Sequence, residues 1–227
     1  MSKPTEDSIL PEGLFSKINS LAHVTNDLKP LLVHATELIS LTKGSTLFNE
    51  RDPAHSFYLI LSGGIKLTKK SNKTKTLIDI LGPGELVGVA LMLNPDETTY
   101  PVNAQTLGPT DILKYTREDF QTRWTQSPPL LDFAHKAILK RIQSVQNDRC
   151  MQRFTLEQKI AYFMTEKWLS SIHLKITRQD IADNIGASQE AVIRLLSDWT
   201  KMGLVQNSNQ EIKIPDIQKL RALWQAA

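Results

Sequence analysis

The chain has 227 residues, of which 41% are hydrophobic, so it can form one large or two modest domains with proper cores and is not an intrinsically disordered protein. No apolar run is long enough to cross a bilayer, and the polar segment from Met1 to Glu12 lacks a signal peptide's apolar stretch, so we expect a soluble, cytoplasmic protein without a membrane partner. A single cysteine, Cys150, excludes an internal disulfide and a multi-cysteine metal site, while a net charge of +3 is compatible with DNA binding without arguing for it.

The N-terminal part of the chain is expected to change from helical to extended structure near Gly44. Residues 1–20 are predicted to form a tail. Leucines and Ala35 recur at helical spacing within residues 14–41, which predicts short helices there.

Residues 44–115 have the pattern of an antiparallel β domain. Short apolar or alternating runs, such as Phe57–Leu61 and Thr76–Leu81, are separated by turn residues such as Gly82-Pro83-Gly84. Several short strands at this spacing predict an antiparallel sandwich or small barrel, within a domain that we place at residues 21–128.

Residues 129–154 are predicted to form one long helix. Pro128 and Pro129 end the β domain, and the segment from Leu130 to about Phe154 contains no Gly or Pro. Such a helix is about 37 Å long, which is more than a small domain needs. It can lie alone on its own β domain, but apolar residues at coiled-coil-like spacings favour a dimer seam. These residues are Leu131, Ala134, Ile138, Ile142 and Val145.

The C-terminal domain, residues 155–227, is expected to begin with a capped helix. Thr155 and Gln158 form a capping box. The helix that follows is predicted to bury Ile160, Phe163, Met164 and Trp168.

Within this domain, the segment from Ile176 to Leu196 is the most informative in the chain, because it reads as two short helices joined by a tight turn. Thr177 with Asp180 can cap the first helix, and Ser188 can cap the second. Gly186 falls where the turn needs a positive φ. The small Ala182 allows close crossing, and four apolar residues are expected between the helices: Ile181, Ile185, Val192 and Leu195.

The second of these helices carries polar residues in its first two turns, namely Gln189, Glu190 and Arg194. Arg can donate to O6 and N7 of guanine, and Glu can accept from N4 of cytosine, so this face can read base edges in a major groove. The alternative is an ordinary helical hairpin in a core, with Glu190 and Arg194 as a surface ion pair of little consequence. We favour DNA reading.

A β-hairpin is predicted after the helix-turn-helix. The runs Gly203–Gln206 and Glu211–Ile214 flank a polar turn at Asn207–Gln210, which is the layout of the wing of a winged helix. Ile217–Ala227 is expected to be a short helix that packs across the domain.

A β-roll, a long helix and a C-terminal winged helix in this order resemble the Crp/Fnr family of transcription regulators. The resemblance is carried by the motifs Ile176–Ala182 and Gly186–Arg194, and in the β domain by Phe57–Leu67 and Gly82–Gly88. It implies an α+β fold: an N-terminal antiparallel β-roll of the cyclic-nucleotide-binding kind, a long dimerisation helix and a C-terminal winged helix-turn-helix. It also implies a homodimer that binds a palindromic operator in double-stranded DNA.

By this resemblance, Glu190 and Arg194 read a TGA-like core in each half-site of the inverted repeat, and Arg178 and Ser188 contact phosphates. Gln189 stands where the cyclic-AMP regulators often carry Arg, so the resemblance does not indicate which outer bases of the half-site are recognised. RNA polymerase is a further partner of the kind that the resemblance implies.

The resemblance also marks a ligand site, where the chain departs from the cyclic-AMP pattern. Val89 stands where the family's ribose-binding Glu is expected, and the expected Arg-Ser pair falls at about Thr99 and Tyr100, with no Arg nearby. The candidate pocket residues are Leu86, Val87, Gly88, Val89, Ala90, Thr99, Tyr100, Val145 and Gln146.

A buried phosphate that lacks its cation partner costs about 3–5 kcal/mol. We therefore expect that cyclic AMP is not bound in the usual mode, and the effector remains unknown. Tyr100 in an apolar pocket can stack on a ligand ring or simply belong to the core.

Other sensing and catalytic chemistry is not indicated. An iron–sulfur cluster needs four Cys ligands, and Cys150 is expected to be a buried, inert thiol. No catalytic motif is present, so we predict no enzyme, metal site or cofactor. The scattered histidines are expected at the surface or satisfied in the core: His23, His34, His55, His135 and His173.

The sequence therefore predicts a homodimeric, sequence-specific DNA-binding transcription regulator. The second hypothesis is a ligand- or protein-binding regulatory module whose winged helix does not read DNA specifically. It is motivated by the low charge from Thr155 onward, where cations barely outnumber acids, whereas Glu190 and Arg194 argue against it.

Overall fold

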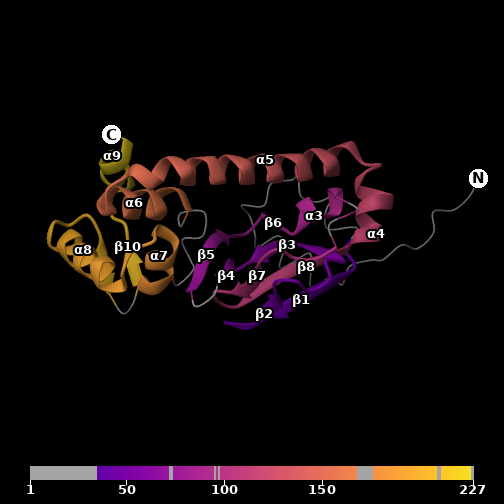
Figure 1. The fold of residues 1–227 in the computed structure, drawn as a ribbon, viewed down its shortest axis with the longest axis horizontal. Helices are drawn as coiled ribbons and strands as arrows, with labels where there is room; N and C mark the ends of the chain where they lie inside the picture. The colour runs from indigo at the N-terminus through magenta and orange to yellow at the C-terminus, as the bar shows by residue number, and fades with distance from the viewer. Residues whose placement is uncertain are drawn as a thin grey trace, which may run out of the picture.

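The computed structural model describes residues 35–71, 74–94, 96, 98–167, 176–208 and 211–225. Figure 1 shows a β-roll and a smaller, mainly helical domain side by side, with the long helix α5 (Pro128–Cys150) running along both. This arrangement confirms the predicted order of β-roll, long helix and winged helix. No helix in the described part of the chain combines the length and apolarity that spanning a bilayer requires.

The roll consists of two four-stranded antiparallel sheets, as the sequence predicted. The first has the order β1 (Glu37–Leu41), β8 (Thr110–Thr116), β3 (Ser56–Ser62) and β6 (Leu86–Val87). The second has the order β2 (Thr46–Phe48), β7 (Asn103–Thr106), β4 (Ile65–Ser71) and β5 (Thr74–Leu81). A short helix, α3 (Val89–Leu93), follows β6.

The helical prediction for residues 14–41 is wrong at its C-terminal end, because Glu37–Leu41 forms strand β1. The apolar residues of this strand face both sides of the sheet: Leu38 packs on one apolar cluster, while Ile39 and Leu41 pack on the other. Pairing with β8, more than 60 residues away (Leu38 opposite Leu113), decides this conformation, which local spacing does not reveal. The rest of the predicted segment, residues 14–34, lies outside the described residues.

An aromatic cluster fills the space between the first sheet and the helices that leave the roll. Phe57 and Tyr115 stack at 5.0 Å, and the ring of Trp124 meets Phe57 edge-on at 4.8 Å. Phe120 and Trp124 lie on the helical turn η2 (Phe120–Trp124), which follows α4 (Arg117–Asp119). This packing holds the start of α5 against the roll.

The long helix begins earlier than predicted, because Pro128 and Pro129 open its first turn rather than ending the chain segment before it. Proline suits this position, since the first N–H groups of a helix have no intrahelical partner. A turn of tighter helix, η3 (Met151–Arg153), continues it. Ion pairs tie α5 to the rest of the chain: Lys140 with Glu85, Arg141 with Asp79, and Asp148 with Lys167.

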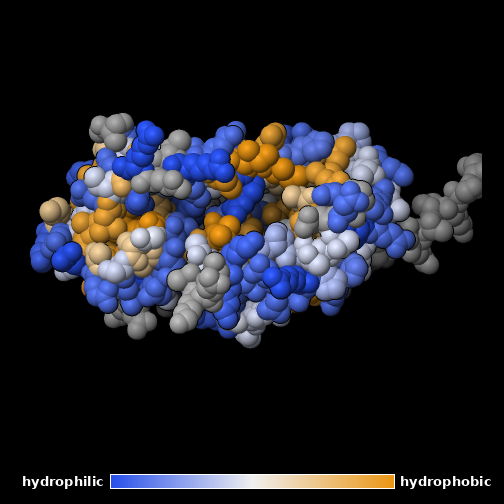
Figure 2. All heavy atoms as spheres, in the orientation of Figure 1, coloured by the Kyte–Doolittle hydropathy of each residue, from blue (hydrophilic) through white to orange (hydrophobic). Residues whose placement is uncertain are grey.

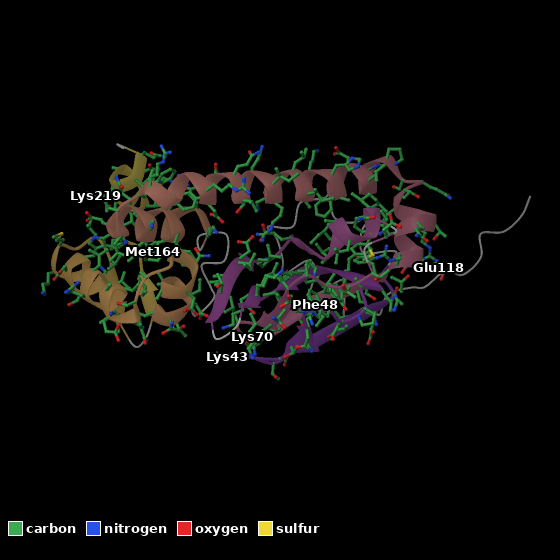
Figure 3. All side chains as sticks on the ribbon, viewed as in Figure 1. Lys43, Phe48, Lys70, Glu118, Met164 and Lys219 are labelled. Atoms are coloured by element: carbon green, nitrogen blue, oxygen red, sulfur yellow. The ribbon has the colours of Figure 1, made fainter. Side chains whose placement is uncertain are left out.

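The C-terminal domain begins with α6 (Leu156–Tyr162), which has the predicted capping box of Thr155 and Gln158 and continues as η4 (Phe163–Lys167). Ile160, Phe163 and Met164 are buried, as expected, and Figure 3 shows Met164 inside this domain. Trp168 lies outside the described residues. The final helix, α9 (Ile217–Gln225), packs on α6, with Trp224 meeting Tyr162 edge-on at 5.2 Å.

Candidate DNA-binding site

The predicted helix-turn-helix is present as α7 (Arg178–Ile185) and α8 (Gln189–Lys201). Gly186 ends α7 with φ 68°, in the left-handed region that favours glycine, and its N–H donates to the carbonyl of Ala182. Ala182 itself is fully buried, which lets the two helices cross closely. Ile181 and Val192 are buried between them, and Ile185 and Leu195 pack at the margin of the same core.

The second helix is held rigidly at both ends. At its start, the side chain of Ser188 accepts a hydrogen bond from the N–H of Ala191 at 3.2 Å, so the expected N-cap is confirmed. Near its end, the fully buried Trp199 donates from Nε1 to Oε1 of Glu157 on α6 at 3.2 Å. The direction of α8 is therefore set by packing, independently of any DNA.

The face of α8 that points away from the core carries the predicted polar set. Gln189, Glu190 and Arg194 are all exposed. Among the described residues, neither the Glu190 carboxylate nor the Arg194 guanidinium has an ion-pair partner, so the surface pair that we considered for them is not formed. Their hydrogen-bonding groups are free to meet a ligand.

Asp180 closes the first turn of α7 and joins it to the roll. Its Oδ2 accepts from Oγ1 of Thr177 at 2.7 Å and completes the predicted capping box, while its Oδ1 accepts from Nζ of Lys66 on β4 at 2.9 Å. Burial by itself raises the pKa of Asp180, but the hydrogen bonds from Thr177 and Lys66 outweigh it and hold the pKa below its ordinary value. The carboxylate is thus ionised and fully engaged.

The wing lies beside the start of α7. It is formed by β9 (Gln206–Ser208) and β10 (Glu211–Lys213), and Asn207 pairs with Ile212, so the strand extends into the segment predicted as a turn. The side chain of Arg178 donates from Nη2 to Oδ1 of Asn207 at 2.6 Å. The polar residues at Asn207–Gln210 predicted a turn over the whole segment. Residue polarity does not reveal the register of a hairpin, so the paired part of the segment could not be recognised.

Sequence reasoning did not single out four residues that shape this site. Three of them form side-chain hydrogen bonds with residues distant in sequence, which no local pattern reveals. The fourth is an apolar residue on the polar face of α8. Its position four residues after Gln189 places it on this face, so helical spacing could have identified it. They are Lys66, Glu157, Asn207 and Ile193.

The candidate ligand-pocket residues differ in their burial. Leu86, Val87, Val89 and Tyr100 are buried, whereas Ala90, Val145 and Gln146 are exposed. Val89, which stands in place of the family's Glu, begins α3 and packs in the apolar cluster of the first sheet. Thr99 bridges to Pro53, and Gly88 adopts φ 82° at the start of α3.

Tyr100 is buried in an apolar cluster of the roll that also contains Phe48 and Val87. Its ring stacks on Phe48 with 3.7 Å between the ring centroids, and its hydroxyl donates to the carbonyl of Ser56 at 2.6 Å. Figure 3 shows Phe48 among the side chains of the roll. A Cβ added to Gly88 would lie 3.3 Å from the Tyr100 ring. Burial, together with Tyr58, raises the pKa of Tyr100.

The apolar residues of α5 divide into two sets. Leu131, Ala134 and Ile138 pack on the roll, and Ala134 is fully buried there, so Ala134 is not available to a partner. On this side, the helix lies on its own β domain, which is the alternative that we considered for α5. Ile142 and Val145 are 48% and 43% exposed, and Leu139, which the predicted seam omitted, is 57% exposed. Figure 2 shows apolar surface along α5.

His55 and His135 lie at the surface, as expected. His23, His34 and His173 lie outside the described residues, as does the side chain of Cys150.

Comparison with known proteins identifies this combination of domains. Residues 38–126 match the model of the cyclic nucleotide-binding domain, and residues 154–223 match that of the Crp-like helix-turn-helix domain. The CRP-like cAMP-activated global transcriptional regulator of Mycobacterium tuberculosis is 24% identical over 229 residues, which cover 94% of this chain and 97% of that protein.

A second relative, the transcriptional activator protein Anr of Pseudomonas aeruginosa, is 28% identical over 81% of this chain and 78% of its own length. The structure of FixK2 from Bradyrhizobium japonicum shares the fold, with a TM-score of 0.70 at 17% identity over 82% of this chain and 96% of that one. The chain belongs to the Crp/Fnr family of DNA-binding transcription regulators.

Proposed function

We propose that this chain acts in the cytoplasm as a homodimer that reads an inverted repeat with a TGA-like core in each half-site. The observation that carries the proposal is the exposed polar face at the start of α8, where Gln189, Glu190 and Arg194 stand free on a helix anchored at Ser188 and Trp199. Arg194 can donate to O6 and N7 of guanine, and Glu190 can accept from N4 of cytosine.

Residues around this face are suited to phosphate contacts. The N-terminus of α8, at Ser188, presents backbone N–H groups, and helix N-termini favour anions. Arg178, which is partly exposed beside the wing, carries a second cation close to the same end of the domain. Contacts of this kind position the protein on the duplex, while Glu190 and Arg194 select the sequence.

The homodimer is supported by the exposed apolar stripe of α5. Leu139, Ile142 and Val145 recur at intervals of three residues on one side of the helix and remain accessible in the single chain. Burial of such side chains against a second α5 removes apolar area from water, at roughly 25 cal/mol per Å². A two-fold seam at α5 would place two copies of α8 to read half-sites about one helical turn apart.

We further propose that cyclic AMP is not the effector in the usual mode. The position of the ribose-binding Glu is held by the buried Val89, and Tyr100, near the expected Arg, is engaged with Phe48 and Ser56. Cyclic-AMP activation is stated of the Mycobacterium tuberculosis relative, whereas this chain lacks the Glu and Arg that the family resemblance places in the nucleotide site. RNA polymerase is a partner that we propose on the family resemblance alone, and we propose no enzymatic activity.

Selection of binding sites from random double-stranded DNA by the full chain tests the function. We expect enrichment of a palindrome with a TGA core. Arg194→Ala should weaken binding to it by about 1–3 kcal/mol per half-site and relax the choice at the guanine. Lys219→Ala, on the outer side of α9 (Figure 3), is the matched loss of one cation and should leave the selected motif unchanged.

Equal affinity of the wild type and Arg194→Ala for the selected palindrome would contradict base reading by Arg194. If no palindrome were recovered, the second hypothesis would be favoured: a ligand- or protein-binding module whose winged helix does not read DNA specifically.

A further inference from the structure

Ile193 exposes a large aliphatic side chain on the polar face of α8. Its side chain is 48% exposed, whereas Val192 and Leu196 on the core side of the same helix are 0% and 2% exposed. A single exposed aliphatic is ordinary on a protein surface. This one requires an explanation because it stands in the first two turns of the helix, among the side chains proposed to read DNA.

The helical repeat places Ile193 beside both readers. Residues four apart lie on one stripe of a helix, so Ile193 follows Gln189 on one stripe, and Glu190 and Arg194 form the neighbouring stripe. All of these side chains are exposed. A base edge within reach of Glu190 and Arg194 therefore lies next to the aliphatic end of Ile193.

The major groove offers one apolar group, the C5-methyl of thymine. We propose that Ile193 is a specificity-determining residue that selects thymine, in or beside the TGA core, by packing on this methyl. The inference rests on the proposed function and adds a hydrophobic contact to the two polar ones. It assigns to Ile193 a base preference that neither Glu190 nor Arg194 can supply.

The alternatives to thymine are disfavoured for a physical reason. Adenine and cytosine present amino groups in the major groove, and guanine presents O6 and N7. An aliphatic side chain packed on any of them would remove water from a polar group without replacing its hydrogen bond. Ile193 is also well prepared for such a contact. Its β-branched side chain has few rotamers in a helix, and the helix is held by the Trp199–Glu157 hydrogen bond.

The experiment replaces each thymine of the selected palindrome in turn by deoxyuridine, symmetrically in both half-sites. Deoxyuridine lacks only the methyl and retains base pairing and O4. Loss of one buried methyl weakens binding about fourfold, so both half-sites together should weaken it about 15-fold. We expect this loss at one symmetric position, and we expect that Ile193→Ala binds the thymine and deoxyuridine duplexes equally.

Two variants control the result. Ile193→Val keeps branched methyl groups and should retain most of the discrimination. Met202→Ala removes another exposed apolar side chain, 69% exposed at the C-terminal end of α8, and should leave the discrimination at its wild-type value. Because Ile193 is exposed and Ala favours helix, Ile193→Ala is expected to fold normally.

The outcomes separate this inference from the function on which it rests. A uniform response to deoxyuridine at every position, or an equal loss in wild type and Ile193→Ala, would overturn the role of Ile193 while leaving sequence-specific binding in place. Absence of any sequence-specific binding by the wild type would overturn the proposed function and, with it, this inference.

Discussion

Nζ of Lys66 lies 2.9 Å from Oδ1 of Asp180, which joins strand β4 of the roll to the first turn of α7. The two side chains are 21% and 11% exposed, so the pair is shielded from most solvent screening. Around it, Leu77 and Ile80 of β5 belong to the same apolar cluster as Ile181 of α7. The helix-turn-helix is therefore docked on the roll by both charge and apolar contact.

Removing either partner of this pair should destabilise the chain. Asp180→Ala loses both the capping box and the ion pair and should lower the free energy of unfolding by about 1–3 kcal/mol. Lys66→Met retains the capping box and should cost less. Urea denaturation of both single variants and the double variant gives the coupling energy, which we expect to exceed about 0.5 kcal/mol. Strict additivity would show that the pair is not formed in solution.

The same carboxylate should make stability depend on pH in the acid range. Its pKa is lower in the folded chain than the value of about 3.9 for unfolded Asp, so folding favours the charged form. The stabilisation is complete above the unfolded pKa and is lost as the pH falls through the lower folded pKa. The stability difference between wild type and Asp180→Asn should therefore shrink as the pH drops below about 4. A constant difference from pH 6 to pH 3 would contradict this assignment.

A charge at Ile142 should prevent dimer formation. Ile142→Asp places a carboxylate in the proposed apolar seam, where an unpaired charge is costly, yet the residue is 48% exposed in the single chain, so the monomer should stay folded. Light scattering coupled to gel filtration should change from a two-chain to a one-chain mass. Gln143→Asp, at the neighbouring exposed position, is the control. An unchanged mass for Ile142→Asp would place the dimer interface elsewhere.

Replacing Arg178 should change the affinity for DNA and its salt dependence, but not the choice of sequence. If Arg178 contacts a phosphate, Arg178→Ala should weaken binding to all sequences about equally and lower the slope of log K against log salt by about 1. Asn207→Ala removes the hydrogen bond of Arg178 to the wing while keeping the cation, and should have a smaller effect. A sequence-selective loss in Arg178→Ala would instead assign it to base reading.

Cyclic AMP and cyclic GMP should not bind tightly. Calorimetry with either nucleotide and the full chain should show no submicromolar dissociation constant, because the buried phosphate would lack its cation. Tyr100→Phe removes the hydroxyl that donates to Ser56 and should lower the free energy of unfolding by about 1 kcal/mol without creating affinity for cyclic AMP. Tight binding by the wild type would show that the chain holds the nucleotide through other residues.

Several features of the site could be predicted from sequence because they are local. The capping boxes at Thr155 and Thr177, the N-cap at Ser188 and the positive φ of Gly186 each involve residues within a few positions of one another. Their side chains meet whenever the helix forms, whatever surrounds it. The regular spacing of turns likewise predicted an antiparallel β domain, and the family resemblance implied that it is a roll.

The remaining features depend on residues that are far apart in the chain. Glu37–Leu41 is a strand because β8 is beside it, Tyr100 belongs to the core because Phe48 covers its ring, and Asp180 meets Lys66 across 114 positions. Which side of α5 is covered likewise follows from the packing of the roll against it, since Leu139 is exposed although its neighbour Ile138 packs on the roll. Sequence determined the helices of the C-terminal domain, their caps and the polar face of α8, whereas only the tertiary structure decided which side chains remain free, because packing between distant segments removes the others from solvent.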